Sequence, residues 1–277
     1  MLNLVFGEPA KVSEHLIASL VVAKVSLTGS TSVGKLVAQQ AAFGLKRTTL
    51  ELGGHAPVIV CADADVDKAA ELLVAGKYRN AGQICIAPTR FYVHESKYAA
   101  FVQAFVQRVA GLKVGNGLEA SSTMGPLANP RRVAAMARLI PDAVQRGAKL
   151  LAGGQRIEGA GFFWQPTVLS EVPEDALLMN EEPFGPIALI NPVASLDEAI
   201  ARANRLPYGL AAYAFTQDSG ARMALSGGLE TGMLGINTLM ISMPEAPFGG
   251  VKESGLGSEC GIEGLTAYCN VRLVSEE

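Results

Sequence analysis

The stretch KVSLTGSTSVGKLVAQQAAFGLKRTTLELGGHAPVIVC, residues 24–61, decides the fold class. KVSLTGS (24–30) is predicted as a short buried strand that runs into a turn, and VGKLVAQQAAF (33–43) has the period of a helix and good helix formers. Two more strand-like runs follow, separated by a pair of glycines: TTLEL (48–52) and APVIVC (56–61). Alternating strands and helices with short connections predict an α/β fold with a parallel, doubly wound sheet.

The same alternation continues to the C-terminus. Asp65 and Ser195 are predicted as N-caps, because a side-chain oxygen there can accept a hydrogen bond from the first turn of a helix. Helices are predicted over residues 12–20, 66–77, 97–112, 130–154 and 195–206. Strands are predicted over 210–216 and 267–274, and a long Gly/Pro-rich loop, PFGGVKESGLG, over 247–257.

Composition excludes several classes of function. A net charge of -3 and the lack of a long Lys/Arg run predict no nucleic-acid partner and no binding to an anionic membrane. No long apolar stretch or signal peptide is seen, so we expect no membrane span. Four cysteines without a CxxC pair predict neither a disulfide scaffold nor a metal site, and favour a cytoplasmic location.

Four separated stretches can carry chemistry. TGSTSVG (28–34) can bring backbone N–H groups to a phosphate at a helix N-terminus, and LELGG (50–54) places Glu51 at a strand end, where a carboxylate can project into a cleft. NAGQICIAPTR (80–90) contains Cys85, and EEPFGP (181–186) has two acids before a turn. Taken singly, each also fits a structural role: a turn, a solvated acid, or a small buried hydrophobe.

In this order, and together with PFGGVKESGLG, these stretches resemble the aldehyde dehydrogenase superfamily, closest to its succinate-semialdehyde dehydrogenase-like branch. The resemblance runs from about Leu2 to the C-terminus and implies the catalytic domain of that fold plus a remnant of its cofactor-binding sheet. It also implies oxidation of a small-molecule aldehyde to a carboxylate. Cys85 matches the nucleophile that attacks the aldehyde, and Glu51 matches the general base that hydrolyses the resulting thioester.

The resemblance further implies a cofactor, NAD or NADP. Gly29, Ser30 and Gly34 match the turn that binds the pyrophosphate. Glu182 matches the carboxylate that holds the nicotinamide ribose, and Phe184 matches the aromatic residue against the nicotinamide.

Three regions follow from the resemblance: a remnant of the dinucleotide-binding domain (1–52), the catalytic domain (53–257) and an oligomerisation segment (258–277). Family members carry a further segment before the first of these, with the second oxyanion donor and the first strands of the nucleotide-binding sheet. We therefore expect impaired cofactor binding and weak or absent activity. An open sheet edge and the C-terminal strand predict a homo-oligomer or pairing with another chain.

Two alternatives stay open. The chain could be an inactive remnant that acts as a binding or assembly partner. It could also be a residual thiol esterase, because acylation of Cys85 by an activated ester and deacylation by Glu51 need no nicotinamide.

Overall fold

The computed structural model describes residues 2–277, and the chain divides into two compact units. Unit 1 comprises Met1–Gly53 and Ser242–Glu277, and unit 2 comprises Gly54–Ile241. Residues 242–257, which the sequence places with the catalytic domain, group with unit 1. The functional division into three regions stays a prediction.

Unit 2 is built on a seven-stranded mixed sheet with the order β10-β9-β3-β4-β7-β6-β5. Neighbouring strands pair in parallel except β5, which runs antiparallel to β6 at one edge. The strands of this unit are β3 (Pro57–Val60), β4 (Arg90–His94), β5 (Lys149–Ala152), β6 (Thr167–Ser170), β7 (Ile187–Val193), β8 (Tyr208–Gly209), β9 (Ala211–Phe215) and β10 (Met233–Ile236).

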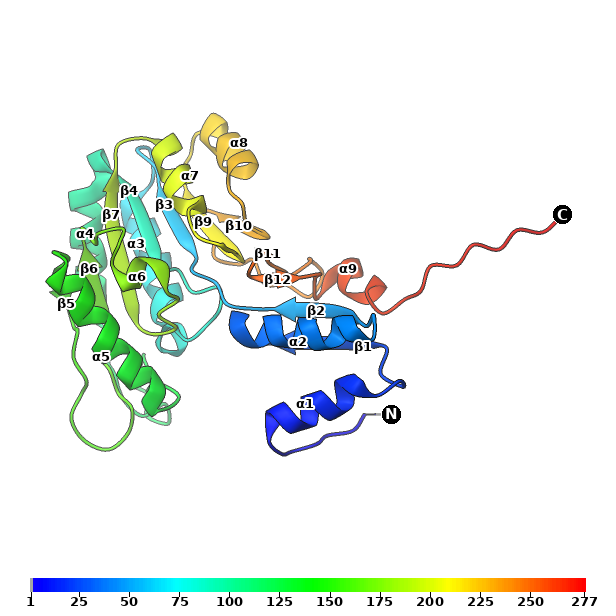
Figure 1. The fold of residues 1–277 in the computed structure, drawn as a ribbon. Helices are drawn as coiled ribbons and strands as arrows, with labels where there is room; N and C mark the ends of the chain where they lie inside the picture. The colour runs from blue at the N-terminus through cyan, green and yellow to red at the C-terminus, as the bar shows by residue number, and fades with distance from the viewer. Residues whose placement is uncertain (1) are drawn as a thin grey trace. The chain divides into compact units, whose positions relative to one another are not determined.

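Helices cover both faces of the sheet in unit 2 (Figure 1). α3 and α4 pack on each other and on one face, and α7 packs on the same strands from the other face, beside α8. The helices are α3 (Val66–Tyr78), the 3-10 helix η1 (Arg79–Gly82), α4 (Glu95–Ala110), α5 (Pro130–Gln145), α6 (Leu177–Asn180), α7 (Leu196–Asn204) and α8 (Ser219–Gly228). The inner strands of this sheet are buried on both faces and consist mainly of apolar residues, whereas the edge strand β5 has no buried residue.

A buried arginine ties the start of unit 2 to the end of α7. The Arg90 guanidinium, 1% exposed, donates to the carbonyl oxygens of His55 (2.9 Å), Ala203 (3.0 Å) and Arg202 (3.2 Å). Carbonyls at a helix C-terminus carry partial negative charge, so they stabilise a buried cation. The backbone at His55, next to Gly54, is thereby fixed.

Unit 1 holds a small three-stranded sheet with the order β1-β2-β12, in which β1 lies at an edge. β1 and β2 pair in parallel, and β12 pairs antiparallel with β2. Its core consists of Ile17, Val37, Ala41, Leu50 and Leu52. The elements are α1 (Pro9–Ala18), β1 (Lys24–Thr28), α2 (Thr31–Phe43), β2 (Arg47–Glu51), β11 (Val251–Lys252), β12 (Gly255–Leu256) and α9 (Gly261–Thr266).

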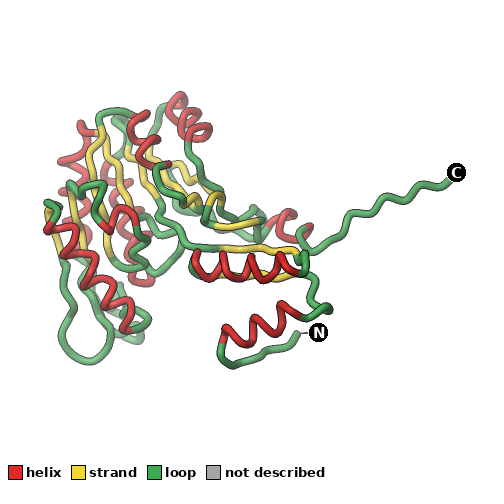
Figure 2. The backbone as a smooth tube through the Cα atoms, viewed as in Figure 1, coloured by secondary structure: helices red, strands yellow, loops and turns green. Residues whose placement is uncertain are grey.

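The structure confirms the α/β class and most predicted elements, but corrects three. The helix predicted over 130–154 ends at Gln145, because residues 149–152 form β5 by pairing with β6. The predicted loop 247–257 contains two short strands, β11 and β12. The strand predicted over 267–274 is wrong for this structure: the chain beyond α9 runs as loop (Figure 2), since it finds no strand partner among the described residues.

No helix in the described part of the chain is both long enough and apolar enough to cross a membrane.

Candidate active site

Cys85 lies in unit 2, half-buried, in the loop between η1 and β4. Three successive residues before it have left-handed backbone: Asn80 (φ 51°), Ala81 (φ 53°) and Gly82 (φ 69°). Asn80 and Gln83 fix this turn reciprocally, each side-chain amide donating to the other's carbonyl at 3.0 Å. Left-handed non-glycine residues cost free energy and persist where the surroundings hold them, often at functional sites.

Two glycines allow the backbone around the Cys85 loop to pack closely. A Cβ at Gly54 would lie 2.8 Å from the carbonyl oxygen of Cys85. A Cβ at Gly82 would lie 2.2 Å from the carbonyl oxygen of Gly185. The loop that carries the thiol is therefore packed directly against the LELGG stretch at Gly54 and against the EEPFGP segment. Only glycine fits at these two positions without moving a backbone.

Glu182 points into the same part of unit 2. Its Oε1 accepts a hydrogen bond from the backbone N–H of Gly54 at 3.2 Å. Burial raises the pKa of Glu182 to about 7, while the Gly54 N–H and the cations Lys77 and Arg132 act in the opposite direction. The structure thus brings Cys85, Gly54 and Glu182 together within unit 2.

Phe184, two residues later, has a left-handed backbone with φ 42°. Its segment is held by Arg132, whose guanidinium donates to the carbonyl oxygen of Pro183 at 3.3 Å, and by the ion pair of Arg138 with Glu181 at 2.5 Å. This turn is therefore fixed from α5, an element that the EEPFGP motif itself does not reveal.

The region of Cys85 also contains an exposed cation. The buried Tyr213 donates its hydroxyl to the carbonyl oxygen of Ile86 at 2.8 Å. Burial raises the pKa of Tyr213; the nearby Cys85 raises it further and Arg79 lowers it. Arg79 and Cys85 therefore act in opposite directions on the pKa of the same phenol.

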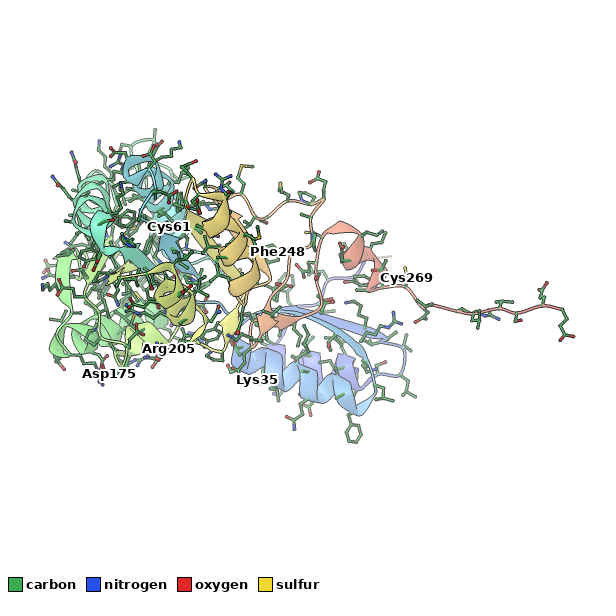
Figure 3. The ribbon with its side chains drawn as sticks, turned by 90° about the horizontal axis from the view of Figure 1, so that it is seen from above. Lys35, Cys61, Asp175, Arg205, Phe248 and Cys269 are labelled. Atoms are coloured by element: carbon green, nitrogen blue, oxygen red, sulfur yellow. The ribbon has the colours of Figure 1, made fainter. Side chains whose placement is uncertain are left out.

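The remaining cysteines lie outside this loop. Cys61, at the end of β3, is buried; burial and Asp63 raise the pKa of its thiol to about 11, which disfavours the thiolate. Cys260 and Cys269 are exposed in unit 1. Cys260 immediately precedes α9 and Cys269 follows it (Cys61 and Cys269 are labelled in Figure 3).

Glu51 lies in unit 1, at the C-terminal end of β2. It is 3% exposed, and within residues 2–277 neither of its carboxylate oxygens has a hydrogen-bond partner. Burial raises the pKa of Glu51 to about 8, and the charge of Glu259 contributes in the same direction. A buried carboxylate with a pKa near neutrality and no partner is typical of a general base.

The turn between β1 and α2, also in unit 1, fits a phosphate. Ser30 caps α2 by accepting from the N–H of Val33 at 3.4 Å, and the N–H of Gly29 donates to the carbonyl of Glu51 at 3.0 Å. Gly34 lies inside the helix, where a Cβ would be 2.3 Å from Leu52, so it permits close packing of helix on strand. An open helix N-terminus combined with such packing suits the pyrophosphate of a dinucleotide.

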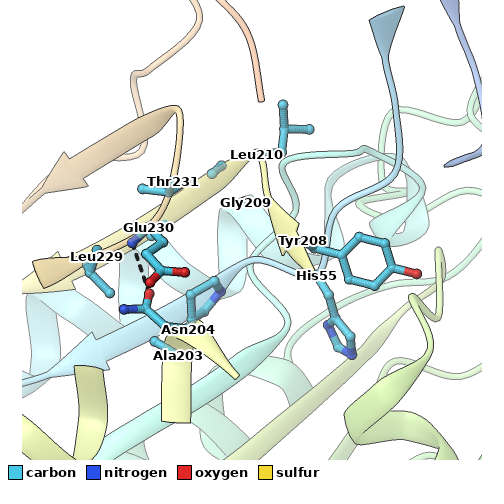
Figure 4. Close-up of a pocket in the computed structure, with 12 residues that line it drawn as sticks. His55, Ala203, Asn204, Tyr208, Gly209, Leu210, Leu229, Glu230 and Thr231 are labelled. Carbon is cyan, nitrogen blue, oxygen red and sulfur yellow. Dashed lines mark hydrogen bonds between the residues drawn. The ribbon is translucent and has the colours of Figure 1, made fainter. Parts of the chain in front are cut away.

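Cavities elsewhere are separate from these residues. A cavity of about 10 Å³ lies beside His55, Asn204 and Glu230, too small for a substrate (Figure 4). Another, of about 310 Å³, lies beside the ends of β3 and β7, and one of about 990 Å³ lies along α1 and α2 in unit 1. Across residues 2–277 no cluster of three metal-binding side chains is found.

Two cations in this region, Lys77 and Arg79, were not identified from the sequence. Lys77 follows the buried Ala69 and Leu73 at intervals of four, so the helical period already places it on the apolar face of α3. A lysine on the apolar face of a predicted helix could therefore have been recognised from the sequence as a candidate functional residue. Arg79 carries no comparable signal, because the turn of η1 decides where it points.

Comparison with known proteins identifies the family. The model of the aldehyde dehydrogenase family matches residues 1–274. The chain is 52% identical over 274 residues to a putative 4-(hydroxymethyl)benzenesulfonate dehydrogenase of Comamonas testosteroni, covering 99% of this chain and 57% of that protein. It is 42% identical over 270 residues to the NADP(+) succinate-semialdehyde dehydrogenase of Escherichia coli K12, covering 98% and 56%.

Solved structures agree. The crystal structure of succinate-semialdehyde dehydrogenase from Burkholderia pseudomallei matches 95% of this chain and 55% of that chain, with a TM-score of 0.93 and 45% identity. The chain thus spans a little over half the length of the relatives it matches. On fold, on ordered motifs and on identity, this chain belongs to the aldehyde dehydrogenase family.

Proposed function

We propose that this chain oxidises an aldehyde to a carboxylate with NAD(P)+, using Cys85 as nucleophile and Glu51 as general base. The observation that carries the proposal is the loop of Cys85, held by close backbone contact with Gly54 beside the carboxylate of Glu182. Family membership supports the reaction class. Because the relatives are nearly twice as long, the activity proposed here concerns the part of the site that these residues carry.

In the first half of the proposed reaction, the Cys85 thiolate adds to the aldehyde carbonyl and forms a thiohemiacetal. The backbone N–H of Cys85 donates to the developing oxyanion, and the fixed turn at Asn80 and Gln83 keeps that donor in place. Loss of hydride from the thiohemiacetal leaves a thioester on Cys85.

In the second half, Glu51 takes a proton from water, which attacks the thioester and releases the carboxylate and the thiol. Glu51 must be ionised to accept that proton. Because burial and Glu259 raise its pKa to about 8, deacylation is expected to accelerate as the pH rises through this value.

The aldehyde dehydrogenase family uses NAD(P), and a bound nicotinamide supplies the hydride acceptor. In this chain the amides of the first turn of α2, after Gly29 and Ser30, are proposed to bind the pyrophosphate. Glu182 would accept hydrogen bonds from ribose hydroxyls, and Phe184 would contact the nicotinamide ring. NAD and NADP are both compatible with these residues.

We infer that the aldehyde carries an anionic group. The names of the relatives describe a benzenesulfonate and succinate semialdehyde, each bearing a sulfonate or carboxylate. Arg79 is exposed and, like Cys85, acts on the pKa of Tyr213. Its guanidinium would pair with the anionic group of the aldehyde. Arg79→Ala is therefore expected to raise KM about tenfold or more for succinate semialdehyde, but not for an uncharged aldehyde of equal length.

The direct test measures NAD(P)H formation with a panel of aldehydes, beside hydrolysis of an activated aryl ester, in the wild type, Cys85→Ala and Glu51→Gln. The proposal expects Cys85→Ala to lack both activities. Glu51→Gln should still be acylated, so that mass spectrometry detects the thioester on Cys85. Retained, Cys85-dependent ester hydrolysis without NAD(P)H would support a thiol esterase instead. Absence of activity in both assays would favour the alternative that the chain is an inactive remnant acting as a binding or assembly partner.

We also propose that the chain associates through unit 1. β1 presents an unpaired strand edge, and α1 and α2 flank an apolar groove. Light scattering that shows a monomer would contradict this. A cytoplasmic location remains a prediction.

A further inference from the structure

The large sheet of unit 2 ends at a cavity that the proposed chemistry does not use. This cavity, of about 310 Å³, lies beyond the ends of β3, β4 and β7, beside Cys61, His94 and Val193. The three strands are parallel neighbours. The chain leaves β3 and β4 into helices on one face of the sheet and leaves β7 into α7 on the other face (Figure 1). Where neighbouring parallel strands connect to opposite faces, their ends leave a crevice, and open α/β sheets bind ligands there.

The cavity and the proposed nucleophile lie at opposite edges of this sheet. The loop of Cys85 precedes β4 and packs on Gly54, before the start of β3. His94, which lines the cavity, is the last residue of β4. The five residues of β4 span about 13 Å between the two edges. A ligand in the cavity would therefore not compete with an aldehyde at Cys85.

Apolar side chains form most of the cavity wall. Ile59, Val193, Leu196 and Ala199 come from β3, β7 and α7. His94 adds a ring whose Nδ1 is engaged with the first turn of α4. An apolar cavity of about 150 Å³ already holds benzene, and dedicated ligand pockets begin at about 300 Å³. The volume therefore suits a ligand of one ring or one branched chain and is too small for a dinucleotide.

Two exposed carboxylates line the same cavity, and none of the described residues that line it is a lysine or an arginine. Asp63 accepts hydrogen bonds from the Thr216 hydroxyl at 2.8 Å and from the N–H groups of Gln217 and Asp218, both at 2.7 Å. Asp218 caps α8 through Oδ1, which accepts from the N–H of Ala221 at 2.6 Å. Within residues 2–277 its Oδ2 forms no hydrogen bond or ion pair, so this oxygen remains an acceptor for a ligand.

The charge at this cavity favours a cation over an anion. Burial raises the pKa of the Cys61 thiol, and the charges of Asp63 and Asp218 raise it further, so both carboxylates act inside the cavity. The N-terminus of α7 has an acid of its own: Ser195 accepts from the N–H of Glu198 at 3.2 Å, and the Glu198 carboxylate accepts from the backbone before the cap at 2.8 Å. An anion would thus meet carboxylates in place of free N–H groups.

We propose that this cavity is a second ligand site, which binds a small apolar ammonium. An aromatic ring or a branched alkyl group would lie against Ile59, Val193 and Leu196, and the ammonium would donate to the carboxylate of Asp218. The site does not rest on the proposed function. A ligand that binds it in the folded chain stabilises unit 2 by mass action and leaves Cys85 accessible.

The probe is benzylammonium, compared with benzyl alcohol and benzoate, which carry a neutral and an anionic group on the same ring. Peptide mapping by mass spectrometry follows the reaction of Cys61 with methyl methanethiosulfonate at neutral pH. Cys61 lines the cavity, whereas Cys260 and Cys269 are exposed in unit 1 and serve as internal controls. We expect benzylammonium to slow the reaction of Cys61 and not that of the controls, at a concentration about fivefold lower than benzyl alcohol requires, with benzoate the weakest.

Two variants locate the site. Asp218→Asn removes the charge but keeps the cap, because asparagine caps helices about as well as aspartate. It should weaken benzylammonium about fivefold, to the level of benzyl alcohol. Its matched control is Asp67→Asn in the first turn of α3, an exposed carboxylate that does not line the cavity, and it should change nothing. Ala221→Leu, half-buried at the start of α8, fills the cavity and should abolish protection of Cys61 by benzylammonium.

The Asp218→Asn comparison holds even where Ala221→Leu does not fold. Protection of Cys61 by benzoate as strong as that by benzylammonium would overturn the proposal. So would the absence of protection by all three probes, or full protection by benzylammonium in Asp218→Asn. These measurements use neither an aldehyde nor a nicotinamide, so failure of the proposed function leaves this test intact.

Discussion

The two units bury their apolar residues to different degrees. In unit 2 the sheet is covered on both faces, and buried side chains such as Leu73, Phe101 and Ile190 are fully enclosed. In unit 1 the core is limited to five residues. Large hydrophobic side chains of unit 1 are exposed to solvent instead: Leu2, Leu4, Val5, Phe6, Leu16, Leu20, Val21, Val33, Leu36, Phe43 and Leu45.

The comparison separates the parts of the proposed chemistry. The nucleophile Cys85 belongs to the unit with a closed core, whereas Glu51 and the N-terminus of α2 belong to the unit with an open sheet edge at β1. A parallel sheet is stable when both faces and both edges are covered. We therefore expect unit 1 to be the less stable of the two. On heating or in denaturant, the environment of Glu51 in unit 1 should unfold before that of Cys85 in unit 2.

The largest expected effect is in the core of unit 2. Leu73 in α3 is fully buried, so Leu73→Ala should lower the free energy of unfolding by about 3 kcal/mol, through lost burial and a residual cavity. Leu36 in α2 of unit 1 is 52% exposed, so Leu36→Ala should cost less than about 1 kcal/mol. Urea unfolding of both variants measures the difference; equal losses would remove the contrast between the units.

The next effect compares one glycine in each unit at which elements approach closely. Gly82→Ala in unit 2 would set a Cβ 2.2 Å from a backbone oxygen at a φ of 69°, so the loop must move. The rate of Cys85 alkylation should fall about tenfold or more. Gly34→Ala in unit 1 meets the side chain of Leu52 at 2.3 Å rather than a backbone atom, and it lies outside the unit that holds Cys85, so it should change that rate little. If alkylation is unchanged in Gly82→Ala, close packing does not position the thiol.

Local chemistry explains which elements the sequence predicts well. Asp65 and Ser195 cap α3 and α7 as predicted, because an N-cap depends on neighbours three residues away. The end of α5 was not predictable in this way, since residues 149–152 become a strand only by pairing with β6. The strand expected at 267–274 failed for the same reason: pairing is non-local.

For the candidate site, too, local sequence patterns predict some features, whereas others depend on non-local packing. Ordered motifs predict Cys85, Glu51 and Glu182 as site residues, but the pKa values of the two carboxyl groups depend on groups far away in sequence. Glu51 acquires its raised pKa from burial and from Glu259. Such environments arise from tertiary packing, which a local pattern does not encode.

A further prediction tests the proposed base Glu51, in unit 1, by its dependence on pH. The pKa of Glu51 is raised from 4.5 to about 8, so its contribution to stability is full below pH 4.5 and is lost as the pH rises through 8. Glu51→Gln should flatten the stability profile between these values. Glu259→Gln removes one of the two causes of the shift and should move the midpoint to lower pH, by about one unit or less. Unfolding measured from pH 4 to 9 follows both changes, and an unaltered profile in Glu51→Gln would mean that the carboxylate is hydrated.

The smallest effect on stability concerns the apolar surface of unit 1. Phe43, at the end of α2, is 99% exposed and contributes no burial within this chain, so Phe43→Ser should change the free energy of unfolding by less than about 0.5 kcal/mol. The same change should reduce self-association, because Phe43 lines the apolar groove along α1 and α2. Light scattering over a concentration series measures it, with Met223→Ser in unit 2, 76% exposed, as the control. If both variants associate as the wild type does, the open surface of unit 1 is not what brings chains together, and the contrast between the units concerns stability alone.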